Sequence, residues 1–225
     1  MRILALIFSI FMSVSVSAQD AFDPFIDYSE FETASEEEAD INFFRNGRFL
    51  TLAVPLSYSS FTSSMSQILD SGTAVGFNLS YFFDLRFAFQ IGIMNSDHAY
   101  HDEDGGTGSL SMNNTLVSMK YFFNMQNVTK GLSNWNPYII GGVTQSYRRL
   151  SRVGSSGTYA QDSGTGFHIG GGIEVPIMGN KMYLAGETKY TLISYPDENT
   201  ALSDSNPSTF PGDLFDASII VGINF

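Results

Sequence analysis

Two histidines beside a run of carboxylates come nearest, in this sequence, to a metal-binding or reactive site. His98 and His101 stand three residues apart in "DHAYHDEDGG" (97–106), where three further acidic residues follow. Imidazole nitrogens next to carboxylate oxygens can hold a divalent metal. The same composition is also typical of a solvated acidic loop, which is the state we expect. The segment therefore leads us to predict no metal site, no catalytic site and no cofactor.

A second set of chemically active side chains consists of six charged residues, each placed within an otherwise uncharged and strongly patterned segment. They are Arg86, Lys120, Glu174, Glu187, Lys189 and Asp216. Three are cationic and three are anionic, so they can form pairs. An isolated charge in an apolar interior would be very costly. Whether the six side chains meet depends on the elements that carry them.

From Asn46 onward the chain alternates between large apolar residues and small or polar ones. The alternation is clearest in "TAVGFNLSYFF" (73–83) and "FDASIIVGINF" (215–225), whereas the two faces of 138–147 are not clearly separated. A strict period of two predicts strands whose two faces have different surroundings. Eight strands are expected, at residues 48–58, 73–83, 85–93, 116–123, 138–147, 166–177, 181–193 and 215–225.

The two faces of these strands are the reverse of those in a soluble barrel. A soluble barrel needs its bulky apolar residues inside, but here the second face is built of Gly, Ala, Ser, Asn, Gln and the six charges. We expect the bulky face to contact lipid and the sheet to close, because a bilayer leaves open edges unpaired. Aromatic residues near the strand ends would form the interfacial girdles: Tyr58, Tyr81, Phe83, Phe123, Tyr138, Tyr190 and Phe225.

The connections between strands alternate in length. Long polar segments at 97–108 and 196–213 contrast with a tight turn near Asp84 and with "MGNK" (178–181). Long loops on one side and short turns on the other are typical of an outer-membrane barrel, whose short turns face the periplasm. The connection at 124–136 departs from this layout because it is long where a short turn is expected.

The first residues have the features of an export signal. "MRILALIFSIFMSVSVSAQD" (1–20) has one positive charge, a short apolar run and small residues, which predicts a signal peptide over 1–18. The apolar run is too short to span a bilayer, which takes roughly 20 residues. The segment 19–45 is strongly acidic between 27 and 40, and we expect it to be a disordered periplasmic segment. Docking of this segment on a basic partner is the alternative. The barrel itself is expected over 46–225.

Composition supports a membrane sheet. The chain has 20 Phe, 11 Tyr and 21 Gly, whereas only 15% of its residues are charged. Many aromatic and few charged residues suit a sheet whose outer face meets an apolar solvent. Cysteine is absent, so no disulfide stabilises the fold. A net charge of −12 argues against nucleic acid as a partner.

Three segments together resemble the small OmpA/OmpX-type outer-membrane β-barrel proteins. They are the terminal strand ending in Phe225, "NPYIIGG" (136–142) and "YLAGETKY" (183–190). The resemblance covers 46–225 and does not extend to a C-terminal peptidoglycan-binding domain. It implies an all-β fold, an eight-stranded antiparallel transmembrane β-barrel in the outer membrane of a Gram-negative bacterium. It also implies that Phe225 is the signal read by the outer-membrane assembly machinery.

The resemblance gives no catalytic signature. His168 has no Ser two residues later, so it does not resemble the His-x-Ser site of the lipid A deacylase barrels. We predict instead that His168 forms hydrogen bonds inside the lumen and that the protein is not an enzyme.

An eight-stranded barrel has a lumen that side chains can fill. We therefore predict that the six charges form a paired network that plugs it. The alternative is that they line a small pore, as in a narrow porin-like channel of the OmpW type for small or apolar solutes. The expected function is envelope-structural, or surface interaction through the extracellular loops. The expected partners are outer-membrane lipid, the assembly machinery and a cation or basic partner at the acidic loops, and the protein is expected to be a monomer.

Overall fold

The computed structural model describes residues 49–62, 64–84, 86–101, 107–123, 135–152, 160–178, 181–196 and 210–225. The predicted signal peptide (1–18) and acidic segment (19–45) lie outside these ranges. So do most residues of the connections at 124–136 and 196–213. Within the described ranges, no helix is both long and apolar enough to cross a membrane.

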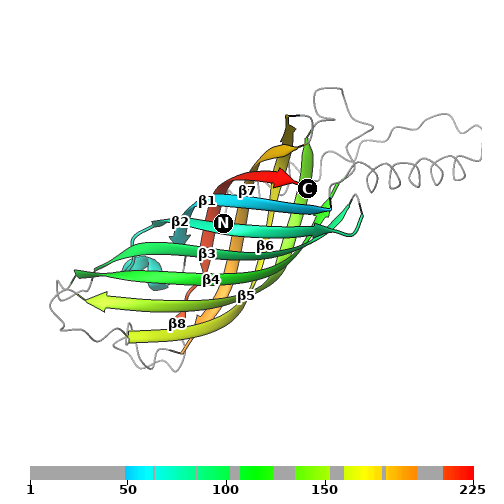
Figure 1. The fold of residues 1–225 in the computed structure, drawn as a ribbon. Coiled ribbons are helices and arrows are strands. Elements are labelled where there is room, and N and C mark those ends of the chain that lie inside the picture. Colours follow the sequence, from blue (N-terminus) through cyan, green and yellow to red (C-terminus); the bar gives the residue numbers. More distant parts are fainter. Residues whose placement is uncertain are drawn as a thin grey trace, which may run out of the picture. The chain divides into compact units, whose positions relative to one another are not determined.

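Eight long strands form one closed antiparallel barrel (Figure 1). They are β1 (Leu50–Phe61), β2 (Gly72–Phe82), β3 (Phe87–His101), β4 (Thr107–Phe122), β5 (Asn136–Arg152), β6 (Ala160–Ile177), β7 (Met182–Tyr195) and β9 (Leu214–Asn224). The two-residue strand β8 (Phe210–Pro211) pairs with β7, and a 3-10 helix, η1 (Ser64–Gln67), lies between β1 and β2. The fold class predicted from the alternation is confirmed.

The barrel closes where the last strand pairs with the first. The register between β1 and β9 runs without interruption from Thr51↔Asn224 to Phe61↔Leu214. Beyond it, the Phe225 N–H donates to the Leu50 carbonyl over 2.8 Å. β9 also pairs with β7 on its other side. The ring of strands therefore has no open edge along the apolar band, as a sheet in lipid requires.

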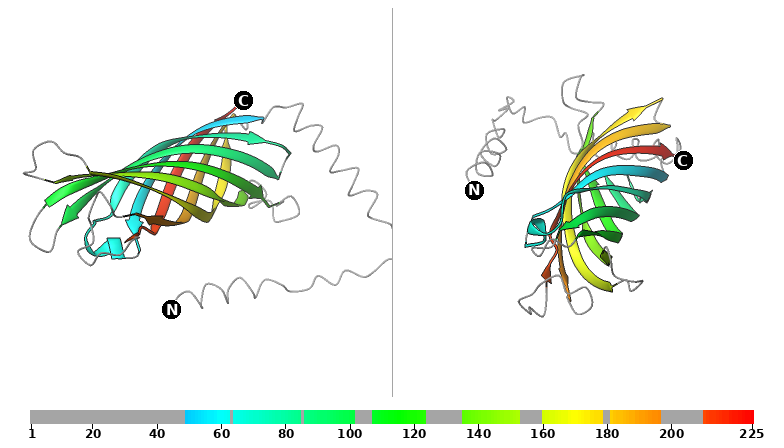
Figure 2. Two further views of the ribbon diagram at one scale, coloured as in Figure 1. Left: turned by 90° about the horizontal axis from the view of Figure 1, so that it is seen from below. Right: turned by 90° about the vertical axis from the view of Figure 1, so that its left-hand side faces the viewer.

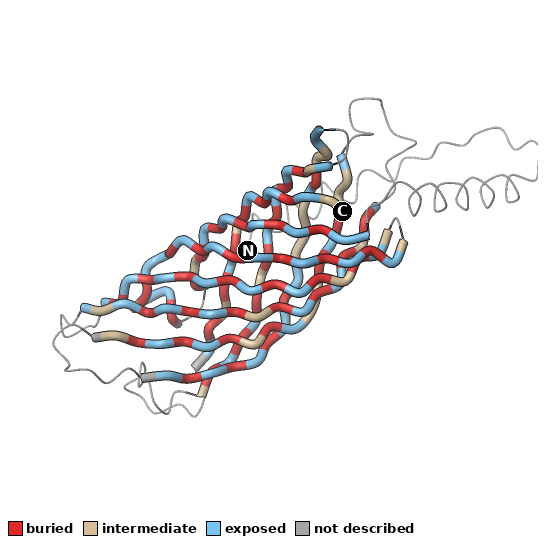
Figure 3. The backbone as a smooth tube through the Cα atoms, viewed as in Figure 1, coloured by how far each residue is buried: buried red, intermediate tan, exposed pale blue. Residues whose placement is uncertain are grey.

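The burial pattern is inverted relative to a soluble barrel. Buried and exposed residues alternate along every strand (Figure 3). The exposed side chains include Leu56, Phe77 and Phe167, whereas the inward positions hold many polar residues. The predicted faces are thus confirmed, with one exception. Tyr138, which we expected in an aromatic girdle, points inward and is buried, because its hydroxyl has a charged partner in the lumen.

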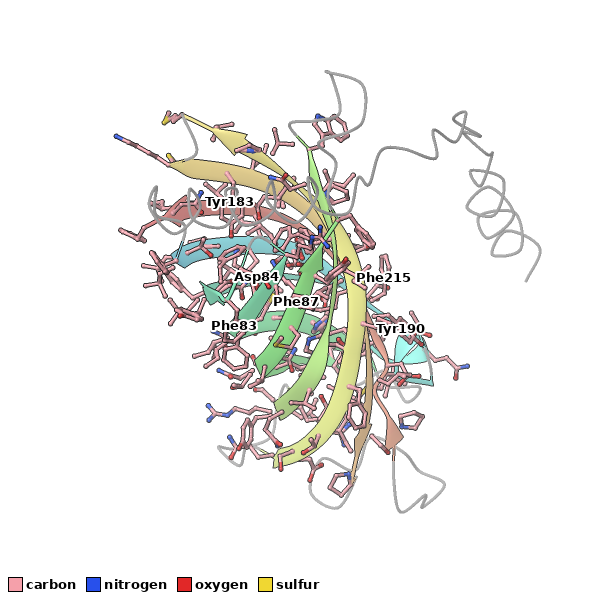
Figure 4. The ribbon with its side chains drawn as sticks, turned by 90° about the vertical axis from the view of Figure 1, so that its right-hand side faces the viewer. Phe83, Asp84, Phe87, Tyr183, Tyr190 and Phe215 are labelled. Atoms are coloured by element: carbon pink, nitrogen blue, oxygen red, sulfur yellow. The ribbon has the colours of Figure 1, made fainter. Side chains whose placement is uncertain are left out.

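The two ends of the barrel differ. The turn end carries the short connections at 83–86 and 178–181, together with Phe225; the loop end is the opposite one. At the turn end, the Asp84 carboxylate accepts hydrogen bonds from the N–H groups of Arg86 and Phe87, at 2.6 and 2.7 Å. Phe83, Asp84 and Phe87 lie together in Figure 4. The side chain of an aspartate thus satisfies the backbone of a tight turn, as its position in the sequence indicated.

The strands reach further toward the loop end than predicted. We expected a loop at 97–108, but β3 continues to His101 and β4 begins at Thr107. The expectation was wrong because polar residues occupy the outward face there as well. Apolar alternation ends where the lipid ends, although backbone pairing continues. The strands β3 to β6 therefore extend beyond their neighbours at this end (Figure 1).

Candidate functional site: the barrel lumen

Three of the predicted charges meet in the middle of the lumen. The Glu187 carboxylate on β7 lies 3.6 Å from the Lys120 Nζ on β4 and 3.6 Å from the Lys189 Nζ on β7, one contact at each carboxylate oxygen. The side chains of these three residues are 2–6% exposed. One carboxylate thus lies between two ammonium groups, where each charge has an oppositely charged partner. We call these three residues the central charge cluster.

Tyr138 completes the surroundings of the carboxylate. Its hydroxyl donates a hydrogen bond to Glu187 Oε2 over 2.8 Å. The Lys120 Nζ lies 4.3 Å from the centre of the Tyr138 ring, within the range of a cation–π contact. One aromatic side chain therefore contacts both charges and also packs against Phe122 at 5.1 Å in the apolar layer below.

A neutral hydrogen-bonded group lies beside the cluster. The His168 Nε2 is 2.8 Å from the Ser118 Oγ, and its Nδ1 is 2.8 Å from the Thr144 Oγ1. A hydroxyl can donate to one ring nitrogen and accept from the other, so both nitrogens of a neutral imidazole are satisfied. This is the lumen hydrogen-bonding role expected for His168.

The other three predicted charges lie on β9, on β6 and in the β2–β3 turn. Asp216 is buried on β9, directly opposite Lys189 of the cluster in the β7–β9 register, and accepts a hydrogen bond from the Ser59 hydroxyl. Glu174 is buried on the inward face of β6. Arg86 lies in the β2–β3 turn, where it is half-buried, because β3 begins only at Phe87. Three of the six predicted charges thus form ion pairs with one another, and a fourth, Asp216, lies opposite one of them, Lys189.

Sequence reasoning missed an ion pair nearer the loop end. The Arg148 Nη2 on β5 lies 3.3 Å from the Asp162 Oδ2 on β6, and both side chains are buried. The guanidinium also lies 4.5 Å from the ring centre of Tyr195. The sequence did not single out Arg148, because Arg149 stands directly beside it. It was also missed because the predicted fifth strand ended at residue 147.

An apolar cluster closes the loop end of the lumen. It consists of Phe61, Met65, Leu69, Tyr100, Leu110, Met112, Leu150, Ile193, Tyr195 and Leu214. Met65 in η1 is fully buried, so this segment folds against the mouth rather than out into solvent. Figure 2 shows η1, in cyan, at this end of the barrel. We call residues 62–71 the lid.

The two histidines of the predicted acidic loop hold the end of the lid. The His98 Nδ1 lies 3.0 Å from the Asp70 carbonyl, and the His101 Nδ1 lies 3.4 Å from the Asp70 carboxylate. His98 is buried in β3, so a solvated loop was the wrong expectation for it. Their spacing of three in a strand puts the two side chains on opposite faces. Because one ring is inside and the other outside, the pair is not arranged to hold one metal ion.

The lumen is therefore filled in three layers. An apolar layer at the turn end contains Phe82, Ala88, Phe122, Tyr138 and Ile140. The central charge cluster and the His168 group lie above it, followed by the Arg148–Asp162 pair and the apolar cluster with the lid. The buried polar groups thus lie between the apolar layer at the turn end and the apolar cluster at the loop end.

Comparison with known proteins places this architecture in a family. The family described as "Outer membrane protein beta-barrel domain" matches residues 6–210. The chain belongs to this family. As a member of the outer membrane protein β-barrel family, it lies in the bacterial outer membrane with its bulky outward face in lipid. Its short-turn end faces the periplasm, as in other outer-membrane barrels.

Solved structures show the same fold at low sequence identity. Neisserial surface protein A (NspA) is similar with a TM-score of 0.58 and 12% identity, covering 78% of this chain and 97% of that chain. The outer membrane protein OprG from Pseudomonas aeruginosa is similar with a TM-score of 0.51 and 13% identity, covering 80% of this chain and 97% of that chain. No curated protein matches the chain.

Proposed function

We propose that this member of the outer membrane protein β-barrel family is a closed, non-enzymatic barrel with an envelope-structural or surface-interaction role at its extracellular end. The observation that carries the proposal is the central charge cluster. Lys120, Glu187 and Lys189 are almost fully buried, mutually paired and enclosed between apolar layers. Such a core fills the barrel and leaves the loop end as the part that meets other molecules.

The paired charges argue against a channel. A solute passing through the centre would have to separate Glu187 from its cations, and breaking one partner from a buried pair costs about 3–5 kcal/mol. The lid adds a second barrier at the extracellular mouth, where Met65 is fully buried. Both barriers support a role that does not depend on transport.

The geometry also argues against catalysis by the buried histidine. Both ring nitrogens of His168 already contact hydroxyl groups, and the side chain is buried beneath the lid. A general base needs hydrogen-bond reach to a substrate proton, which this position does not offer. The loop end is therefore the part of the barrel that we propose interacts with other molecules.

Planar-bilayer recording tests the closed lumen. The wild-type barrel is expected to show no steady conductance. The variant Glu187→Ala/Lys189→Ala is expected to show openings, whereas Ser118→Ala/Thr144→Ala, which removes hydroxyls from the same level, is expected to remain closed. Steady solute conductance of the wild-type protein would defeat the proposal in favour of the narrow OmpW-type channel.

The partner at the loop end is proposed to be a cation or a basic molecule. Asp70 and Asp97 are exposed there and Asp213 is partly exposed, whereas the other acidic residues of 97–108 and 196–213 lie outside the described ranges. Acidic loops on a rigid scaffold suit a positively charged partner. Deleting residues 199–208 should leave the barrel folded and abolish binding of such a partner. Binding that survives this and every other loop deletion would refute the assignment.

A further inference from the structure

The outer wall of the barrel contains a groove. It has a volume of about 800 Å³ and crosses β3, β2, β1, β9 and β7. Its outward-facing lining runs from Asn95 and Asp97 through Tyr58 and Ala217 to Gly186. Ligand sites typically have volumes of about 300–1,000 Å³, so this groove is large enough to hold part of a lipid.

Small residues beside large ones make the wall concave. An added Cβ at Gly186 would meet no other residue within 4 Å, so there is open space above this glycine. Ala217, on the neighbouring strand, is also small and only partly exposed. Leu56, Tyr58 and Ile219 project on either side and are 56–61% exposed. The small residues therefore form the bottom of the groove, and the large flanking side chains form its sides.

The groove runs obliquely through one leaflet. Its path follows residues that are paired directly across neighbouring strands, from β3 to β7. In order these are Asp97, Thr73, Tyr58, Ala217 and Thr188. Four strand spacings of about 4.8 Å give a length of about 19 Å. Because strands in such barrels tilt by about 35–45°, this path descends about 11–13 Å. That depth is close to half of a hydrocarbon core of about 30 Å.

The groove is polar at its extracellular end and apolar at its other end, as the headgroup and the acyl chain of a lipid are. At the extracellular end, Asn95 and Asp97 face outward just above the last lipid-facing apolar residue of β3, Ile93. At the other end, Gly186 lies between Leu184 and Thr188 on β7, within the apolar band. A headgroup region at the first end and an acyl chain toward the second would match both environments.

We propose that this groove binds one acyl chain of lipid A, the glycolipid of the outer leaflet. Asp97 Oδ1 accepts a hydrogen bond from the Ser111 hydroxyl and Asn95 Oδ1 accepts one from the Asn113 amide. The second carboxylate oxygen of Asp97 and the side-chain amide of Asn95 suit the hydroxyl and amide groups near the carbonyl end of such chains. A second copy of the protein fits less well. A two-fold contact would set groove against groove and leave both hollow.

Native mass spectrometry of the barrel extracted in mild detergent, with lipid A added, tests the site. The wild type is expected to retain one lipid A molecule. Gly186→Leu fills the groove and should lower retention at least tenfold. Gly141→Leu is the matched control, because Gly141 faces outward on β5 and an added Cβ there is 3.5 Å from its nearest neighbour, His168 O. This control should retain lipid A as the wild type does.

Three results would overturn the proposal. They are unchanged retention in Gly186→Leu, equal retention of a phospholipid in place of lipid A, and a dimer that Gly186→Leu dissociates. A second measurement covers the case in which Gly186→Leu fails to fold. Refolded wild-type barrel should unfold at a higher urea concentration in vesicles that contain lipid A, and Ala217→Leu should abolish this shift. An identical shift in Ala217→Leu would refute the site.

Discussion

The hydroxyl of Tyr138 on β5 donates a hydrogen bond to the carboxylate of Glu187 on β7, although β6 lies between these strands. The contact therefore crosses the interior instead of following the wall. It joins the apolar layer at the periplasmic end to the central charge cluster, because Tyr138 belongs to the first and contacts the second.

We predict that Tyr138→Phe destabilises the folded barrel by about 1.5–3 kcal/mol, the range for a hydrogen bond to a charged group. The control is Tyr147→Phe on the same strand, whose side chain is exposed on the outer face and which should cost much less. Urea unfolding in lipid vesicles measures both. Equal costs would mean that the contact across the lumen contributes nothing.

The second prediction concerns the balance of charge in the lumen. Glu187→Gln leaves Lys120 and Lys189 without their carboxylate, and removing one member of a buried pair costs about 3–5 kcal/mol. The double variant Lys120→Met/Glu187→Gln also removes the Lys120 ammonium, whereas Lys189 keeps Asp216 opposite it in the β7–β9 register, and this variant should recover most of that loss. The same unfolding assay applies, and a double variant that is less stable than the single one would contradict the pairing.

The third prediction tests the lipid-facing wall. Leu52→Arg and Ile91→Arg place a charge on the outer face within the apolar band and should each cost about 2–4 kcal/mol. Ser109→Arg is the control. An inward position such as Gln90 would not serve, because Gln90 is buried in the packed lumen and accepts a hydrogen bond from Ser80. Ser109 faces outward near the loop end of β4. Equal costs at Leu52 and Ser109 would mean that the apolar band is misplaced.

The fourth prediction concerns the lid. Truncating a buried Met to Ala costs about 2–5 kcal/mol, and 1.4 kcal/mol is about a tenfold change in an equilibrium. Met65→Ala should therefore speed limited proteolysis within residues 62–71 by about tenfold or more. Gln67→Ala, at an exposed position of η1, serves as the control. Unchanged cleavage in Met65→Ala would show that this side chain does not hold the lid.

The fifth prediction concerns assembly. Phe225 pairs with Leu50 and Phe49 at the closing seam, and its exposed ring lies on the lipid-facing side. Deleting Phe225, or Phe225→Asp, should reduce the amount of folded, heat-modifiable barrel in the outer-membrane fraction. Phe225→Tyr keeps an aromatic ring and should assemble normally. Normal assembly of the deletion variant would refute the role of Phe225 as a signal.

The membrane-embedded part of the fold could be predicted because its two faces meet different solvents. In 73–83 every second residue is apolar, and the structure exposes that face to lipid. In β3 beyond Asn95 the outward residues include the polar Asp97 and His101, while inward His98 is polar too. Polar and apolar residues no longer alternate there, although the side chains still point alternately into and out of the barrel. The strand ends were therefore invisible to a method that reads polarity alone.

The lumen was predictable in part for a related reason. Glu187 and Lys189 stood out because a charge in an apolar pattern needs a partner. Tyr138 did not, because a ring with a hydroxyl fits an interfacial girdle as well as an interior hydrogen bond. Arg148 stood next to another arginine, and only the pairing register with Asp162 shows which of the two faces inward.

The unequal strand lengths make the two sides of the barrel different at the extracellular end. β6 continues from Gly164 to Ala160 past the start of its pairing with β7. This adds about 16 Å along the strand at 3.3 Å per residue, or about 12–14 Å of height at a strand tilt of about 35–45°. Neighbours in a membrane arrive sideways, by diffusion in two dimensions. Among the described residues, a molecule that approaches over β4 and β5 meets extended polar strands, whereas one that approaches over β1 and β9 meets strands that end at Phe61 and Leu214, next to the lid. The side of the barrel from which a neighbour diffuses in the membrane plane thus determines which part of the extracellular end it meets first.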